Sequence, residues 1–274
     1  MDKVSDAIRA ATDTLTPTSD TARLDAELLM AHALGVPRSD MLIRMMDQPA
    51  PDTFAAMIER RSASEPVAYI TGSQEFYGRE FAVEPGVLIP RADSEVLIEA
   101  ALELRAQPQR VLDLGTGSGA LLLTILCEQP AANGVGLDAS PIAARVAGTN
   151  AARLVGEGDC QMIRGDWRED GWREGLGRFD LILCNPPYVE TDAKLDPDVR
   201  DYEPASALFA GSDGLDDYRI LIPQLRGLMA AEAIVLFEIG ATQAEPVTKL
   251  AQEAGFGVEI RNDLANRPRC VILW

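Results

Sequence analysis

The chain has 274 residues, of which 47% are apolar and 25% are charged, values typical of compact globular proteins and unlike those of disordered or fibrous chains. This length suits one large domain or a catalytic domain with a smaller companion, and we expect two unequal parts. Asp and Glu number 43 against 25 Lys and Arg, so the formal net charge is -18. Such a charge repels phosphate backbones, and we expect no direct nucleic-acid binding.

The cysteines and the single histidine argue against two common kinds of site. The four cysteines lie far apart with no C-x-x-C pair, which fits neither a disulfide framework nor a zinc site. His32 falls in an apolar helical stretch, where a packing role is favoured over a catalytic one. We therefore expect reduced thiols, no metal and chemistry that runs without histidine.

Neither a leader nor a membrane span is visible in the sequence. Residues 1–10 mix charges with short apolar side chains and lack the core of a signal peptide, and no apolar run approaches membrane-spanning length. We expect a cytoplasmic protein with no membrane partner.

The N-terminal part predicts helices. Ser19-Asp20 is a good N-cap, an apolar stripe follows it, and Gly35 predicts the end of that helix. A second helix is expected to carry Pro51 in its first turn. The two apolar stripes consist of Leu24, Leu28, Ala31 and Leu34 in the first helix, and of Phe54, Met57, Ile58 and Arg61 in the second. Residues 1–72 thus predict a small helical domain, and its separateness from the rest of the chain makes it a candidate for docking a substrate.

The remainder predicts a hairpin and then an α/β domain. Aromatic and β-branched residues broken by Gly78 and Pro85-Gly86 predict a β-hairpin linker over 73–90. In residues 91–274, short apolar strands alternate with helical segments, which predicts a parallel sheet covered by helices on both faces. The predicted strands are Val111–Leu114, Gly134–Asp138, Gln161–Arg164, Phe179–Cys184 and Ala233–Ile239, with two more near Gly257–Arg261 and Cys270–Leu273.

A glycine-rich turn follows the first of these strands. Gly115, Thr116, Gly117, Ser118 and Gly119 place three glycines where a strand passes into a helix, and such turns let a ligand approach unpaired backbone N–H groups. Taken alone the turn is a weak signal, because a tight turn without a ligand has the same pattern.

Two observations favour a nucleoside cofactor without a pyrophosphate. Asp138 ends the second strand, 23 residues after Gly115, where a carboxylate binds ribose hydroxyls in nucleotide-binding α/β folds; a capping role before Ser140-Pro141 is compatible with this. The spacing is G-x-G-x-G and not the dinucleotide G-x-G-x-x-G. Asp113 at the mouth of the turn would repel a pyrophosphate but suit a cationic amino group. We expect S-adenosylmethionine, with NAD the weaker candidate.

Gly165-Asp166-Trp167 follows the third predicted strand. A hydrogen-bond acceptor and an aromatic ring at this edge of the sheet would suit an adenine base, so we expect Trp167 to contact the cofactor.

Asn185, Pro186, Pro187 and Tyr188 follow the fourth strand and face the same crevice. The prolines remove two N–H donors and fix the backbone, which leaves a rigid group of acceptors. The Asn185 side chain and a proline carbonyl, which we assign to Pro186, would accept both N–H bonds of a planar amide while Tyr188 stacks on it. Asn185, Pro186 and Tyr188 are therefore the expected catalytic residues, and the reasoning leaves a glutamine amide and the exocyclic nitrogen of adenine both open as acceptors.

The sequence resembles the HemK/PrmC family of peptide chain release factor glutamine methyltransferases over nearly its whole length. Besides the glycine turn and Asn-Pro-Pro-Tyr, the resemblance includes Ala68–Gly72 with Glu75-Phe76, Leu88–Glu95, Tyr202–Pro204 with Ala207-Leu208, and Asp263–Asn266. It implies a class I, Rossmann-like, seven-stranded S-adenosylmethionine methyltransferase domain joined through a β-hairpin to a helical domain.

The resemblance also implies site residues and a substrate. Gly115 to Gly119, Asp138, Trp167 and Asn185 correspond to cofactor contacts, and Asn185 to Tyr188 to the glutamine pocket. The implied partners are class I peptide chain release factors, methylated on the glutamine of their Gly-Gly-Gln motif, and we expect the enzyme to be a monomer.

Three other functions compete. An adenine methyltransferase acting on nucleic acid would need a basic surface, yet acidic side chains outnumber basic ones in residues 1–72. A glutamine of a ribosomal protein would fit the same pocket and is separated only by the flanking motifs. A non-catalytic cofactor-binding module would not need an intact Asn-Pro-Pro-Tyr.

Overall fold

The computed structural model describes residues 2–156 and 158–274, which form two compact units. The smaller, helical unit comprises residues 2–73 together with Leu195–Tyr202. The larger unit comprises the rest of the chain from Gln74 to Trp274. No pattern in the sequence indicates that residues 195–202 join the helical unit, and the domain limits expected at residues 72 and 90 stay a prediction.

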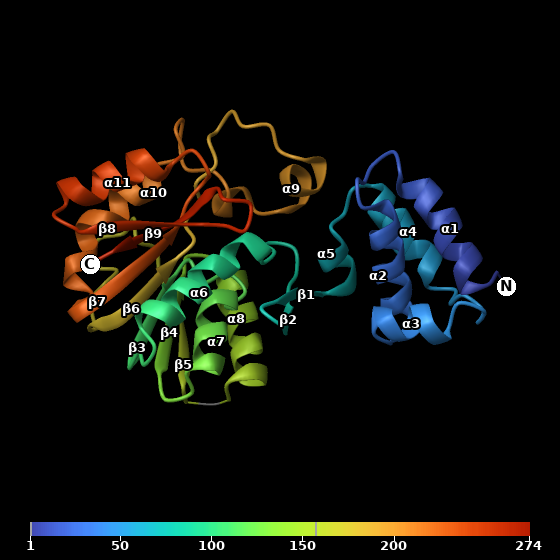
Figure 1. Cartoon of the computed structure of the whole chain (residues 1–274), viewed down its shortest axis with the longest axis horizontal. Coiled ribbons are helices and arrows are strands. Elements are labelled where there is room, and N and C mark those ends of the chain that lie inside the picture. Colours follow the sequence, from blue (N-terminus) through green and yellow to red (C-terminus); the bar gives the residue numbers. More distant parts are fainter. Residues whose placement is uncertain (1, 157) are drawn as a thin grey trace. The chain divides into compact units, whose positions relative to one another are not determined.

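The helical unit contains short helices around one apolar core (Figure 1). They are α1 (Val4–Leu15), α2 (Ala22–Leu34), α3 (Arg38–Arg44), α4 (Phe54–Ser62) and α5 (Val67–Thr71). Helix α9 (Pro197–Tyr202) belongs to the same unit but has no buried residue. Gly35 ends α2 in the left-handed conformation, with φ of 68°, as the sequence predicts.

Two details of the predicted helices are corrected. The N-cap of α2 is Thr21 and not Ser19-Asp20, and Leu24 and Leu28 in its predicted apolar stripe are exposed by 40% and 37%. The buried side of α2 instead carries Ala26 and Leu29. Because α2 has apolar residues on both sides, their spacing alone does not identify the side that packs. The helix predicted to include Pro51 in its first turn begins at Phe54.

A buried ion pair lies inside this unit. Arg61 of α4 donates from Nε to Asp25 Oδ2 of α2 at 2.7 Å, and both side chains are buried. Asp25 also accepts hydrogen bonds from Ser19 and Thr21, so its charge is compensated on several sides. Segment 195–202 is attached here by a hydrogen bond of 2.8 Å from Tyr202 Oη to the carbonyl oxygen of Ala63.

The larger unit is built on a seven-stranded sheet of order β5-β4-β3-β6-β7-β9-β8. The strands are β3 (Arg110–Leu114), β4 (Asn133–Asp138), β5 (Cys160–Arg164), β6 (Phe179–Cys184), β7 (Met229–Glu238), β8 (Val258–Asn262) and β9 (Pro268–Leu273). The seven predicted strands are all present, which confirms the α/β fold class.

The sheet is mixed where the repeating strand–helix pattern predicted parallel strands throughout. Strands β5, β4, β3, β6 and β7 are parallel neighbours, whereas β9 pairs antiparallel with both β7 and β8. Only a short turn joins β8 to β9, and a turn of that length cannot make the crossover that a parallel pair requires.

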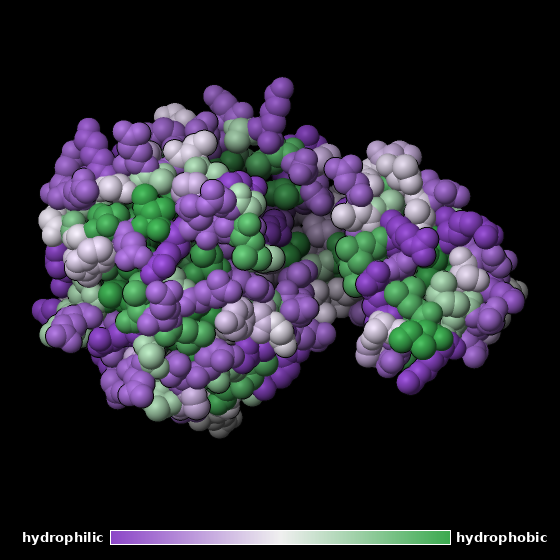
Figure 2. All heavy atoms as spheres, in the orientation of Figure 1, coloured by the Kyte–Doolittle hydropathy of each residue, from purple (hydrophilic) through white to green (hydrophobic). Residues whose placement is uncertain are grey.

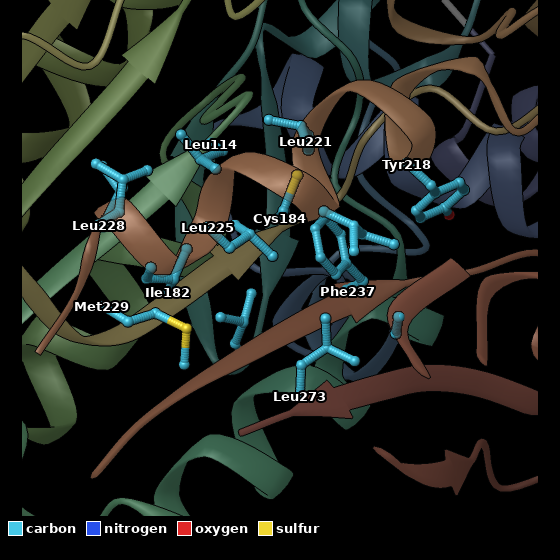
Figure 3. Close-up of a cluster of buried hydrophobic side chains, with 14 of the residues drawn as sticks. Leu114, Ile182, Cys184, Tyr218, Leu221, Leu225, Leu228, Met229, Phe237 and Leu273 are labelled. Carbon is cyan, nitrogen blue, oxygen red and sulfur yellow. The ribbon is translucent and has the colours of Figure 1, made fainter. Parts of the chain in front are cut away.

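Helices cover both faces of this sheet. One face packs against α6 (Glu95–Leu104), α7 (Ala120–Glu128) and α8 (Pro141–Leu154), and the other against α10 (Asp216–Leu221), the 3-10 helix η3 (Ile222–Gly227) and α11 (Ala244–Glu253). Alternate residues of the strands supply the two cores, so that Val111 belongs to the first and Leu112 to the second. Figure 3 shows the second core, which includes Tyr218 and Phe237. Their rings pack edge to face with centroids 5.6 Å apart.

Strands β1 (Ser73–Phe76) and β2 (Arg79–Ala82) form the expected hairpin. Asn150 of α8, which is fully buried, accepts from the Ala82 N–H at 2.8 Å and donates to the Ala82 carbonyl at 3.0 Å. Asn150 also donates to the carbonyl of Ser118 at 2.8 Å. A single amide thus joins the hairpin to the glycine-rich turn.

Hydrophilic side chains predominate on the face shown in Figure 2, with smaller apolar areas between them. Within the part of the chain that the structure describes, no helix is long and apolar enough to cross a bilayer.

Candidate functional site

The glycine-rich turn lies between β3 and α7. Gly115, Gly117 and Gly119 have φ values of 73°, 57° and 85°, a region that side chains disfavour. The N–H groups of Gly115 and Thr116 both donate to the Leu137 carbonyl, which fastens the turn to β4. The sequence requires glycine here because the turn is left-handed three times within five residues.

Asp138 ends β4 directly beside this turn. Its Oδ2 accepts the Gly117 N–H at 2.9 Å, and its Oδ1 accepts the Ser140 N–H at 2.8 Å. Burial raises the pKa of this carboxyl, and the two backbone donors oppose the shift. Asp138 therefore shapes the turn and also lines the cavity described below, so the capping role and a ligand-binding role are compatible.

Asp113 does not lie at the mouth of the turn as its position in the sequence suggested. It is 1% exposed, and its Oδ2 accepts the Thr116 hydroxyl at 2.7 Å. Burial raises the pKa of Asp113 to about 7, while the hydrogen bond from Thr116 opposes the shift. Asp113 therefore supports the turn from inside the protein through Thr116, and it does not line the cavity that a ligand would enter.

Trp167 follows β5 and is buried. Its indole Nε1 donates to Asp217 Oδ1 of α10 at 2.7 Å, which fixes the orientation of the ring. The ring covers Gly115, where a Cβ atom would lie 3.2 Å from the nearest ring carbon. That position would also lie 3.8 Å from the Asn185 carbonyl oxygen, so three of the expected segments converge at Gly115.

Asn185 to Tyr188 begin where β6 ends, at the same edge of the sheet. The Tyr188 hydroxyl donates to Glu238 Oε1 at 3.1 Å, and burial raises the pKa of this tyrosine. The Tyr188 carbonyl accepts a hydrogen bond of 2.9 Å from Gln243 Nε2. The tetrad is thereby tied to the segment that follows β7.

One cavity of about 240 Å³ in the larger unit joins most of these residues. Of the residues expected from the sequence, it is lined by Gly115, Thr116, Gly117, Ser118, Asp138, Trp167, Asn185 and Pro187. Gly119, Pro186 and Tyr188 are not part of its wall. Gly119 is instead the N-cap of α7, and a Cβ atom there would lie only 2.8 Å from a methyl carbon of Leu123.

Other wall residues had no role assigned from the sequence. They are Phe76, Gly86–Arg91, Ser94, Ala120, Leu121, Ala139, Ser140, Ala143, Arg168, Pro204, Ser206 and Ala207. Asp166, the hydrogen-bond acceptor expected beside Trp167, also lines the cavity. Arg91 pairs with buried Glu203, and these two residues come from the Leu88–Glu95 and Tyr202–Pro204 segments that carry the family resemblance. The family resemblance drew attention to both segments, but neither contains a residue pattern that indicates a chemical role.

No cluster of three or more His, Cys, Asp or Glu side chains that could hold a metal ion occurs among residues 2–156 and 158–274. The expected cofactor, S-adenosylmethionine, has a fused aromatic base, a ribose and a charged amino-acid end. The cavity offers Trp167, the Asp138 carboxylate and a side-chain-free glycine backbone, which suit these three parts in turn. The residues present therefore fit this cofactor.

Comparison with known proteins identifies two family matches. Residues 6–72 match a family described as the PrmC N-terminal domain, and residues 91–201 match the methyltransferase small domain. A release factor glutamine methyltransferase from Cereibacter sphaeroides is 40% identical and covers 98% of this chain and 97% of its own length. A protein of the same name from Rhodospirillum rubrum is 39% identical over 91% of this chain and 78% of its own length.

Solved structures share the fold at low sequence identity. A methyltransferase from Pyrococcus furiosus superposes with a TM-score of 0.54 at 15% identity, covering 81% of this chain and 97% of that one. A ribosomal protein L11 methylase from Lactobacillus delbrueckii has a TM-score of 0.50 at 19% identity, covering 73% and 89%. These neighbours confirm a methyltransferase fold.

Proposed function

The chain belongs to the family of release factor glutamine methyltransferases, and we propose that it methylates the glutamine of the Gly-Gly-Gln motif in class I peptide chain release factors. The enzyme is a methyltransferase that depends on S-adenosylmethionine. A release factor substrate would place the reaction in the cytoplasm. The observation that carries the proposal is that Asn185 and Pro187 line the same cavity as the glycine-rich turn and Asp138.

The cofactor is assigned to the half of the cavity around the turn. Bound S-adenosylmethionine supplies an electrophilic methyl group. The ribose hydroxyls are assigned to Asp138, whose oxygens can each accept a further hydrogen bond. The base is assigned to the wall formed by Asp166 and Trp167, and the amino-acid end to the backbone of Gly115 to Ser118.

The acceptor is assigned to Asn185, Pro186, Pro187 and Tyr188. An amide nitrogen is a poor nucleophile because its lone pair is delocalised, so it must be held in one orientation. The Asn185 side-chain oxygen and the Pro186 carbonyl accept its two N–H bonds, and Tyr188 borders the amide. No histidine base is required, since the proton is lost to solvent after transfer.

The acidic balance of the chain favours a protein acceptor over nucleic acid. The net charge of -18 opposes close approach of a phosphate backbone. We assign the docking of the release factor to the helical unit, in keeping with the match of residues 6–72 to the PrmC N-terminal domain.

The proposed activity is tested by transfer of labelled methyl from S-adenosylmethionine to a purified class I release factor. We expect label on the intact factor and none on the same factor with its Gly-Gly-Gln glutamine replaced by alanine. Mass spectrometry should place one methyl group on that glutamine. Equal labelling of DNA or RNA, or no preference for the intact factor, would reject the proposal.

Replacement of Asn185 by alanine tests the acceptor site separately. We expect Asn185→Ala to lower kcat at least a hundredfold, because one of the two amide acceptors is lost, and to leave cofactor binding measurable by calorimetry. Asn262→Ala, an exposed asparagine in β8, is the matched control and should retain wild-type turnover. Near-normal turnover of Asn185→Ala would contradict this assignment.

A further inference from the structure

A buried carboxylate lies behind the Asn-Pro-Pro-Tyr segment. Glu238 is the last residue of β7, the strand that pairs with β6, and it is 1% exposed. Its Oε1 accepts the Tyr188 hydroxyl at 3.1 Å, and its Oε2 accepts the Ser94 hydroxyl at 2.5 Å. The two donors come from segments about fifty and about 140 residues away in sequence.

Such a charge is expensive to bury. Burial raises the pKa of Glu238, against the effect of Ser94, of the Arg269 guanidinium and of Tyr188, while Asp93 adds to the increase. Removing the carboxylate alone would leave the Ser94 and Tyr188 hydroxyls without their acceptor, so its hydrogen bonds offset part of this cost. A buried charge is nonetheless weak evidence for stability, and what these contacts define is the orientation of the two hydroxyl groups.

The opposite end of Tyr188 is held as well. Gln243 donates from Nε2 to the Tyr188 carbonyl at 2.9 Å and to the Gly214 carbonyl at 3.2 Å, and its Oε1 accepts the Gly240 N–H at 3.0 Å. The backbone at Gly214 passes so close to Tyr188 that a Cβ atom on Gly214 would lie 2.2 Å from the Tyr188 carbonyl oxygen. Tyr188 is thus fixed at its hydroxyl and at its carbonyl.

Restraint of Tyr188 reaches the acceptor site through the two prolines. Pro186 and Pro187 have fixed φ angles, so few backbone rotations separate Tyr188 from Asn185. Ser94 links the same carboxylate to the cavity wall, which it lines together with Asn185 and Pro187. Movement of Glu238 would therefore displace the acceptor segment relative to that wall.

We propose that Glu238 is a positioning residue for methyl transfer, holding the Tyr188 hydroxyl so that Asn185 and Pro186 meet the acceptor amide in the reactive orientation. This role rests on the proposed function. It concerns orientation of the acceptor and not affinity for the cofactor, which is assigned to the other half of the cavity.

Three variants and one control test this role. Tyr188→Phe removes the donor, Glu238→Met removes the acceptor at similar volume, and Glu238→Gln keeps one acceptor oxygen for the tyrosine. Tyr218→Phe is the matched control, because the Tyr218 hydroxyl donates at 2.6 Å to the main-chain oxygen of the same glutamate. The measurements are kcat and KM with the release factor, cofactor affinity and thermal unfolding.

We expect Tyr188→Phe and Glu238→Met each to lower kcat about tenfold to a hundredfold, the effect of a small misplacement of reacting groups. Glu238→Gln should recover part of that loss, and cofactor affinity should stay within about twofold in all variants. The double variant Tyr188→Phe with Glu238→Met should lose no more kcat than the more impaired of the two single variants, because both substitutions disrupt the same contact. Tyr218→Phe should unfold at lower temperature yet keep the wild-type kcat.

Full kcat in Tyr188→Phe would overturn the proposal even if the Glu238 variants fail to fold. So would losses that multiply in the double variant, or a kcat that follows thermal stability across all the variants, Tyr218→Phe included. Failure of the wild-type protein to methylate any release factor is a different outcome, which rejects the proposed function and this role together.

Discussion

Two carboxylates beside the glycine-rich turn have different environments, although Asp138 is the last residue of β4 and Asp113 the next-to-last residue of β3. Asp138 accepts two backbone N–H groups and lines the cavity, whereas Asp113 lies beneath the turn with the Thr116 hydroxyl on one oxygen. The difference makes Asp138 suitable for contact with a ligand and Asp113 sensitive to pH.

The contribution of Asp113 to the stability of the protein should fall as the pH rises from about 4 to about 7. Burial raises the pKa of Asp113 from 3.8 to about 7, so in this window the folded state holds a proton that the unfolded state has lost. The unfolding free energy then decreases with pH, by on the order of 4 kcal/mol for this group, and the effect levels off above pH 7. Denaturant titrations of the wild type and Asp113→Asn at pH 5 and pH 8 measure it.

Asp113→Asn keeps the size of the side chain and an acceptor for Thr116 but cannot ionise. Its unfolding free energy should therefore decrease less between the two pH values than that of the wild type. An identical pH dependence in both proteins would show that the change arises elsewhere.

The sequence predicts where a side chain lies when its position depends on the strand next to it. It does not predict contacts between residues that are far apart in the chain. The expected positions of Asp138 and Asn185 depend only on where a strand ends, Asp138 being the last residue of β4 and Asn185 the first after β6, and the apolar runs reveal both ends. The contact of Tyr188 with Glu238 depends on β6 and β7 being neighbours in the sheet. Trp167 was expected at the cavity, but the hydrogen bond to Asp217 that orients it joins residues fifty positions apart.

At the scale of elements, the hairpin β1–β2 illustrates the limit of a local pattern. The aromatic and β-branched residues broken by Gly78 predicted both strands, but not that Asn150 of α8 would join Ala82 to the glycine-rich turn. An asparagine in a helix usually faces solvent, and nothing near it in sequence indicates burial. The strand β9 was predicted, but its antiparallel direction was missed for a similar reason, since strand direction follows from the connections and not from apolar content.

Removal of the Asn150 amide should weaken the protein and its cofactor site together. Asn150→Ala leaves the N–H and carbonyl of Ala82 and the carbonyl of Ser118 without their partner, at a cost of about 3 kcal/mol in unfolding free energy. Because Ser118 lies in the turn, the dissociation constant for S-adenosylmethionine should also rise. Thr149→Ala, an exposed change on the same helix, is the control for both measurements.

At the scale of the whole molecule, the chain passes between the two units three times, after residues 73, 194 and 202. The first passage was expected near residue 72 from the change of composition. The other two were not, because residues 195–202 show no helical periodicity long enough to distinguish them from a loop. Their place in the helical unit depends on contacts with distant residues, such as the bond from Tyr202 to Ala63.

Deletion of residues 1–73 should abolish methylation of an intact release factor while S-adenosylmethionine still binds. The helical unit is the proposed docking site, whereas every residue assigned to the cofactor lies in the larger unit. A second deletion variant, with residues 195–202 also replaced by a Gly-Ser linker, controls for exposure of that segment. Undiminished methylation by either variant would contradict docking through the helical unit.

Segment 195–202 also affects which products of recombination between related genes would fold well. A crossover near residue 73 would bring in new helices α1 to α5 but keep the old α9, whose Tyr202 and Asp198 meet Ala63 and Arg61 of the former partner. Such a chimaera would combine surfaces that had not been selected together. Residues 61–63 and residues 198–202 lie more than a hundred positions apart in the sequence, yet we expect substitutions in one stretch to be accompanied by substitutions in the other.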